Sequence, residues 1–132
     1  MVKEAYCSKK VSELLREKGF LTDIDLRITQ NLSFYDDIGL RHNLNKYYNS
    51  LIQDKIAFVV APTHQMSMAW LREVHNLCIS IYYLFPYGYT VDILYTDKDT
   101  HFTEFRKIRN NQYDSYEEAV EAALKYTLEN LI

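Results

Sequence analysis

The sequence is poor in the residues that break regular structure and in those that build reactive loops. Its 132 residues include only three glycines, two prolines and two cysteines. The glycines stand singly, which excludes the glycine-rich loop that cradles phosphate groups. A G-x-S-x-G nucleophile elbow is missing as well. Cys7 and Cys78 lie far apart in the chain, so we expect two reduced thiols, with a disulfide as the less favoured alternative.

Runs of hydrophobic residues and of one charge are short. The longest apolar run, residues 77–85, is too short to cross a bilayer, and the N-terminal residues do not resemble a signal peptide. We therefore expect a cytoplasmic protein with no membrane segment. The formal net charge is −3, which argues against general binding to nucleic acids or anionic membranes.

Hydrophobic and aromatic side chains are plentiful. Hydrophobic residues make up 48% of the chain, and the aromatic share of 14% includes twelve tyrosines. A chain of this length and composition is expected to bury enough apolar surface to fold as one domain, residues 1–132, without metals or disulfides.

The clearest periodicity runs through residues 61–97, where a helix is followed by a β-hairpin. Pro62 disfavours helical dihedrals at Ala61, so Thr63 is the expected N-cap, and Asn76 is the expected left-handed residue at the end. The side predicted to face the core holds Met66, Ala69, Trp70 and Val74, with Leu71 at its edge.

The hairpin is predicted from strict alternation in two strands, residues 77–84 and 89–96. Pro86 and Gly88 break the alternation and supply the turn. The more apolar alternating set is expected to face the helices and comprises Leu77, Ile79, Ile81, Tyr83, Tyr89, Val91, Ile93 and Tyr95.

The opposite face of the hairpin carries a modest apolar patch among polar residues. The patch consists of Tyr82, Leu84 and Leu94. Patches of this kind are often buried by another part of the protein or by a partner. We expect either the segment 36–60 or a second copy of the chain to cover it, and covering by the segment is favoured.

Two further helices are predicted at the ends of the chain. Residues 8–18 form the first, with Ser8 as N-cap and Gly19 beyond its end. Ser115 and Glu118 match a capping box that opens the last helix. The core side of that helix is predicted to hold Tyr116, Ala119, Val120, Ala123, Leu124, Thr127 and Leu131. Glu121 and Lys125 are predicted to pair on its outer side.

The segments between these elements are less regular. Strands are predicted at residues 23–29, 56–60 and 101–109. Residues 41–54 are predicted to be irregular because their asparagines lower helix propensity, with a weak helix as the alternative. The fold class that results is α+β, an antiparallel sheet of three to five strands with about three helices packed mainly on one face.

Two blocks of the sequence carry a resemblance to a known family. They are PTHQMSMAWLREVHNLCISI at residues 62–81 and YDSYEEAVEAALKYTLENLI at residues 113–132. In the proline-threonine helix start, the WLREVHN block and the closing SYEEA helix, the chain resembles a family of small uncharacterised proteins of gut Bacteroidetes and their phages or mobile elements. The resemblance implies a bacterial or phage origin and no particular activity.

No group of residues matches a catalytic, cofactor-binding or metal-binding pattern. His64 and His75 lie about 16 Å apart along one helix, so they cannot share an ion. A Cys78 nucleophile paired with His75 is the one enzymatic idea, but Cys78 is expected to be a small packing residue. Glu73 falls at the border of the apolar side of its helix, and we expect its carboxylate to reach water instead of forming a buried acid.

A small basic cluster suggests one alternative function. Arg106, Lys107 and Arg109, beside Phe102 and Phe105, are similar to the aromatic-plus-cation surfaces that bind single-stranded nucleic acid. An ordinary amphipathic strand explains the same residues equally well.

The tyrosines near the hairpin tip indicate a different surface. Tyrosine suits protein interfaces because it offers apolar area with a polar end. The candidate interaction surface comprises Tyr82, Leu84, Tyr87, Tyr89 and Leu94. The favoured function is a small non-enzymatic protein-interaction module of a bacterial or phage mobile element, whose partner is a protein or the chain itself as a homodimer. The alternatives are a nucleic-acid-binding accessory protein and an undescribed small enzyme.

Overall fold

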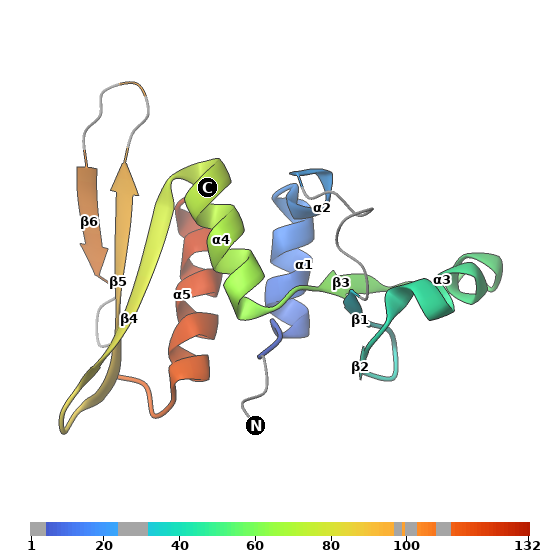
Figure 1. Ribbon diagram of the computed structural model, residues 1–132, viewed down its shortest axis with the longest axis horizontal. Helices are drawn as coiled ribbons and strands as arrows, with labels where there is room; N and C mark the ends of the chain where they lie inside the picture. The colour runs from blue at the N-terminus through green and yellow to red at the C-terminus, as the bar shows by residue number, and fades with distance from the viewer. Residues whose placement is uncertain (1–4, 24–31, 97–98, 100–102, 108–111) are drawn as a thin grey trace. The chain divides into compact units, whose positions relative to one another are not determined.

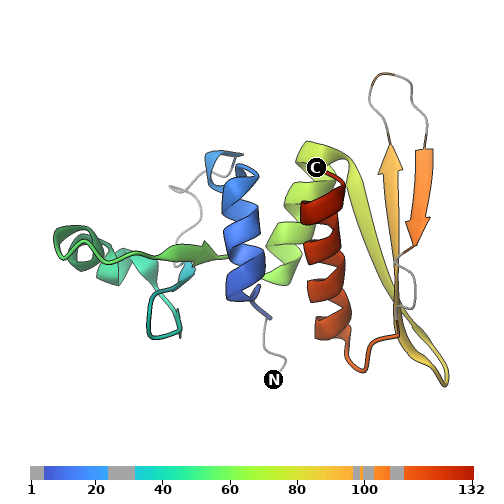
Figure 2. The ribbon, with the colours of Figure 1, turned by 180° about the vertical axis from the view of Figure 1, so that it is seen from behind.

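The computed structural model describes residues 5–23, 32–96, 99, 103–107 and 112–132 of the chain. They form five helices and six strands, and the strands build two antiparallel sheets of three strands each (Figure 1 and Figure 2). The predicted α+β class with antiparallel strands is confirmed, although the strands are divided between two sheets. The chain separates into two compact units, residues 1–63 and 64–132. The expectation of a single domain stays a prediction.

The first unit combines helices with a small sheet whose strand order is β2-β1-β3. Its elements are α1 (Lys9–Glu17), α2 (Phe20–Asp23), β1 (Ser33–Tyr35), β2 (Leu40–Arg41), α3 (Leu44–Gln53) and β3 (Val59–Ala61). Phe34 in β1 is fully buried. Its ring lies 6.0 Å from that of Tyr47 in α3 and 6.1 Å from that of Phe58, measured between centroids. These aromatic contacts hold α3 and the approach to β3 against the same strand.

Helix α1 begins and ends as its sequence predicts. The Ser8 hydroxyl accepts a hydrogen bond from the Val11 N–H at 3.2 Å, which caps the first turn. Gly19 follows the helix with a φ of 90°, a conformation that glycine adopts without strain. The side of the helix that is buried holds Val11, Leu14 and Leu15.

The prediction that residues 41–54 are irregular is wrong, because most of them form α3. Leu44 and Leu51 are buried two turns apart on one side of this helix. Each buried leucine contributes about 1.5–3 kcal/mol, whereas each asparagine costs up to about 0.7 kcal/mol in propensity. Burial therefore outweighs the weak helix propensity. Tyr48, between these leucines in the sequence, is about half exposed.

The strands of the first unit were predicted only in part. β3 occupies the end of the predicted strand 56–60 and one residue beyond it, and Ile56 and Ala57 are exposed ahead of it. β1 and β2 flank residues 36–39, and neither was expected as a strand. The predicted strand 23–29 begins with Asp23, which ends α2, and otherwise lies outside the described residues.

The second unit places two helices on one face of a sheet with strand order β4-β5-β6 (Figure 1 and Figure 2). Its elements are α4 (His64–His75), β4 (Leu77–Leu84), β5 (Gly88–Thr96), β6 (Thr103–Lys107) and α5 (Tyr116–Asn130). The predicted hairpin is confirmed almost residue for residue. Residues 103–107 of the predicted strand 101–109 form β6, and the others lie outside the described residues.

The inward face of the hairpin is also confirmed. Leu77, Val91 and Ile93 are fully buried beneath the helices. Burial fades towards the turn, where Tyr83 of the same alternating set is more than half exposed. The sheet therefore has a core end beside the helices and an exposed end at the turn.

Helix α4 has the predicted limits, with Asn76 left-handed at φ 56° immediately after it, but its buried side is rotated from the prediction. Trp70 is buried as expected, whereas Val74 is 38% exposed and Leu71 is fully buried. The reason is that two polar residues, His64 and Ser67, are buried as well. A helical wheel that counts only apolar residues therefore places the centre of the buried face of α4 incorrectly.

Helix α5 follows its predicted cap and core. The Ser115 hydroxyl accepts a hydrogen bond from the Glu118 N–H at 3.1 Å. The buried residues include the predicted Ala119, Val120, Ala123, Leu124 and Thr127, together with Leu128. Tyr116, which was expected on the core side, is exposed because it lies in the first turn of the helix.

Candidate interaction surface on the hairpin

The tip of the β4–β5 hairpin exposes several large apolar side chains. Residues 77–91 contain no charged residue. Phe85 is 80% exposed and Tyr87 is 62% exposed, and Leu84 beside them is half exposed. Sequence reasoning assigned Phe85 to the turn but not to the surface, although its position beside Pro86 in a hairpin turn indicates exposure.

Three of the five predicted surface residues lie on one face. The strand register pairs Tyr82 with Thr90 and Cys78 with Leu94, which puts Tyr82, Leu84 and Leu94 on the side away from the helices. Tyr82 and Leu94 are 37% and 38% exposed. Covering of this patch, by the segment 36–60 or by a second copy of the chain, stays a prediction.

Tyr89 lies on the opposite face and has a structural role there. Its ring contacts those of Tyr83 and Tyr116 at centroid distances of 5.2 and 6.1 Å. Its backbone exchanges two hydrogen bonds with Tyr113, at 2.9 and 3.0 Å. Tyr89 thus anchors the hairpin to the residues that lead into α5 instead of contributing to the exposed patch.

Gly88 permits the close approach of Tyr113 to the hairpin. Gly88 has a φ of 110°, and a Cβ atom on this residue would lie 2.7 Å from the Tyr113 carbonyl oxygen. Any side chain here would clash with that backbone. Gly88 therefore fixes where the exposed tip begins.

A partly buried histidine–glutamate pair joins α4 and α5, and sequence reasoning missed it. Nε2 of His64 lies 2.8 Å from Oε1 of Glu121, while Nδ1 of His64 is buried and has no hydrogen-bond partner. Glu121 was predicted to pair with Lys125, but Lys125 lies 3.9 Å from Glu129 instead. The only signal was that Glu121 lies next to the buried stripe of its helix.

The other residues considered for chemistry do not form a reactive group. Glu73 is exposed, as expected, so the alternative of a buried acid is wrong. The His75 ring packs edge-on against the Trp70 ring, with 4.7 Å between the ring centroids. Cys78 is half-buried in β4 as a free thiol. The enzymatic hypothesis therefore gains no support from this part of the unit.

The basic cluster is described only in part. Arg106 and Lys107 lie in β6, where the backbone register pairs them with Ile93 and Asp92. Arg109 lies outside the described residues. Nucleic-acid binding through these residues stays a prediction.

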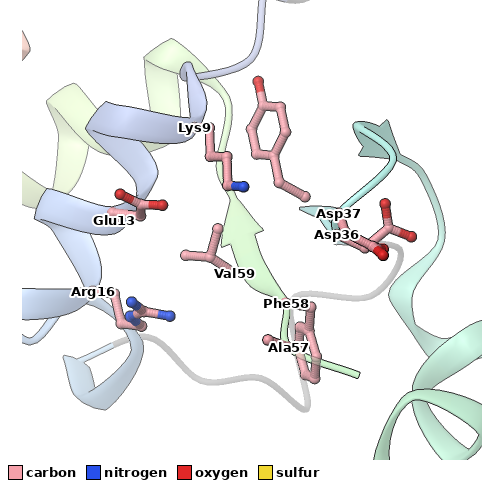
Figure 3. Close-up of a pocket in the computed structure, with 9 residues that line it drawn as sticks. Lys9, Glu13, Arg16, Asp36, Asp37, Ala57, Phe58 and Val59 are labelled. Carbon is pink, nitrogen blue, oxygen red and sulfur yellow. The ribbon is translucent and has the colours of Figure 1, made fainter. Parts of the chain in front are cut away.

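The first unit contains an open pocket of about 240 Å³ (Figure 3). Lys9, Glu13 and Arg16 approach it from α1, and Asp36 and Asp37 lie on the far side. The remaining lining is supplied by Tyr35, Ala57, Phe58 and Val59. Charges of both signs surround an apolar floor, so the pocket matches neither a simple anion site nor a simple cation site.

Asp36 has a structural role in this pocket. Its Oδ1 accepts hydrogen bonds from the N–H groups of Ile38 and Gly39 at 2.9 and 3.1 Å, and its Oδ2 lies 3.1 Å from Arg41 Nε. Burial alone would raise the pKa of this carboxyl, but the two backbone hydrogen bonds and the Arg41 charge together lower the pKa below its ordinary value. The carboxylate therefore fastens the turn between β1 and β2.

Comparison of the chain with protein-family models, curated proteins and solved structures finds no match. Among the described residues, no helix combines the length and the apolar character needed to span a membrane.

Proposed function

We propose that the chain is a small protein-interaction module that binds its partner through the exposed part of the β4–β5 hairpin. The observation that carries this proposal is the concentration of exposed apolar side chains at the tip of the hairpin, within the uncharged residues 77–91. Phe85, Tyr87, Leu84 and Tyr83 are each at least half exposed. A concentration of exposed apolar side chains is costly in water and commonly marks a contact site.

The composition of the tip favours a protein partner. Tyrosine and phenylalanine offer large contact areas at a small cost in side-chain entropy, which is why aromatic residues dominate the centres of protein interfaces. The tip has no cation to contact phosphates, and phosphate contacts supply most of the affinity for nucleic acid. The resemblance of residues 62–81 and 113–132 to proteins of gut Bacteroidetes and their phages supports a role in a bacterial or phage mobile element.

Site-specific photo-crosslinking tests the proposal. A benzophenone amino acid at position 85 should give discrete covalent adducts with protein in the producing cell. The same probe at Glu129, an exposed residue on α5, serves as the control and should give none. Adducts at position 85 should disappear when Leu84 is replaced by aspartate, because a charge beside the probe opposes burial of the tip. Equal labelling at positions 85 and 129, or none at 85, contradicts the proposal.

A further inference from the structure

We propose that β4 is the pairing edge of a symmetric dimer, in which it lies antiparallel to β4 of a second copy with Ile81 at the two-fold axis. This inference rests on the proposed function and names its partner. It concerns the edge of the sheet, a surface different from the face that carries Tyr82 and Leu94.

The outer edge of β4 is open. In the sheet order β4-β5-β6, this strand pairs with β5 alone, and none of the described residues pairs with its other side. An open strand edge presents a row of unpaired N–H and C=O groups that can accept another strand.

The hydrogen bonds of Tyr89 in β5 show which residues of β4 direct their backbone N–H and C=O groups to the open edge. Its N–H and C=O both bond Tyr113, so they point away from β4. Backbone direction alternates along an antiparallel strand, so Thr90, Asp92 and Leu94 are the residues that bond β4. In β4, their respective partners are Tyr82, Ser80 and Cys78. The alternate residues Ile79, Ile81 and Tyr83 therefore direct their backbone groups to the open edge.

The two outer strands of this sheet are protected very differently. β6 reads TEFRK and carries three charged residues in five positions. Charged residues on an edge strand, especially lysine, oppose pairing with another chain. β4 reads LCISIYYL, with eight residues and no charge, proline or glycine. The charges of β6 therefore oppose pairing at one edge of the sheet, whereas the edge formed by β4 can accept another strand.

The open edge is complementary to itself. A two-fold axis at Ile81 places Ile79 opposite Tyr83 of the second copy and Ser80 opposite Tyr82, with no like charges facing one another. Leu77 is fully buried at the start of the strand. The residues whose backbone groups point to the open edge are then Ile79, Ile81 and Tyr83, and Ile81 lies at their centre. Ile79 and Ile81 are only half-buried although they face the helices. Pairing extends that apolar layer across the axis.

Charged substitutions of Ile81, the residue at the two-fold axis, test the pairing. Wild-type protein should sediment with a mass that rises with concentration from 15.7 kDa towards twice that value. Ile81→Lys and Ile81→Glu should each be monomeric with unchanged far-ultraviolet circular dichroism, because each places like charges opposite one another. A one-to-one mixture of the two variants should recover the dimer. A wild type that stays monomeric at millimolar concentration, or a mixture that stays monomeric, overturns the proposal.

Control variants keep the test decisive. Leu94→Lys puts the same charge on the exposed face of the central strand and should leave the dimer intact, whereas loss of the dimer would show face-to-face stacking and overturn edge pairing. If the Ile81 variants do not fold, Tyr83→Lys places a charge opposite Ile79 of the second copy, at a more exposed residue of the same edge, and should also be monomeric; a dimer that persists in this variant overturns the pairing.

Amide hydrogen exchange supplies an independent readout. The amides of Ile79, Ile81 and Tyr83 should become protected as concentration rises, while those of Ser80 and Tyr82 should be protected throughout because they bond β5. Protection that does not change with concentration overturns the dimer. A monomer that still gives adducts at position 85 overturns only the dimer, whereas a monomer that gives none overturns the proposed function as well.

Discussion

Single residues hold the ends of the hairpin and the turns of this protein in place, and Gly88 is the sharpest example. Its positive φ and the nearby Tyr113 carbonyl leave no room for a side chain. Gly88→Ala should lower the free energy of unfolding by about 1–3 kcal/mol, measured in urea. Gly19→Ala is the matched control, because Gly19 also has positive φ but has open space around it. Equal losses for the two variants would contradict the close approach to Tyr113.

Asp36 makes the stability of the first unit depend on pH. The folded-state pKa of its carboxyl lies below the unfolded value of about 3.9, so the native state binds fewer protons in this range. The stabilisation is present above that pH and is lost as pH falls through the folded-state pKa. Asp36→Asn should therefore differ most from wild type near pH 7, and the difference should narrow below about pH 4. Asp37→Asn, at an exposed neighbour, should show no such trend in the same urea titrations.

Among the elements, α4 shows where a helical wheel succeeds and where it fails. Trp70 is buried, so Trp70→Ala should cost about 3–5 kcal/mol. Val74→Ala should cost less than about 1 kcal/mol, because this valine faces solvent in part. Denaturant melts of the two variants compare these sites directly, and similar costs would mean that the helix is rotated towards its predicted orientation.

Most elements of this fold could be predicted from periodicity and capping, and the exceptions have physical causes. The hairpin and α5 combine strong alternation or a capping box with clear turn residues. Helix α3 was missed because local propensity carries no information about the burial of Leu44 and Leu51. The orientation of α4 was missed because His64 is buried through a contact with Glu121 on a helix more than forty residues away. Pairings of this kind are tertiary and leave little local trace.

The sequence predicted an apolar and aromatic surface at the hairpin tip, but not every residue assigned to it lies there. Exposure of Leu84 and Tyr87 follows from their place near a turn. Tyr89 was assigned to the surface because tyrosines are common there, but its partner Tyr113 lies in a segment whose approach to the hairpin depends on Gly88. The gradual loss of burial along β4 depends on where the helices end, which alternation does not reveal.

At the scale of the whole molecule, urea denaturation tests whether the two compact units unfold together. Trp70 is the only tryptophan, so its fluorescence reports on the second unit alone. Leu51→Ala removes a buried side chain from the first unit and should cost about 2–5 kcal/mol. For a single domain, the Trp70 transition in urea should move to lower concentration together with the circular dichroism. An unmoved fluorescence curve would show two independently stable domains.

The unequal edges of the second sheet also limit how far the protein can assemble through this sheet. Fibre growth by strand addition needs two receptive edges in every subunit, because each new chain must offer a site for the next. In the described part of this sheet, β6 carries charged residues that oppose pairing, whereas β4 is an uncharged edge that can accept a strand. Any pairing through β4 consumes the receptive edge and leaves charged edges outermost. Under the proposed pairing, assembly through this sheet therefore ends at the dimer.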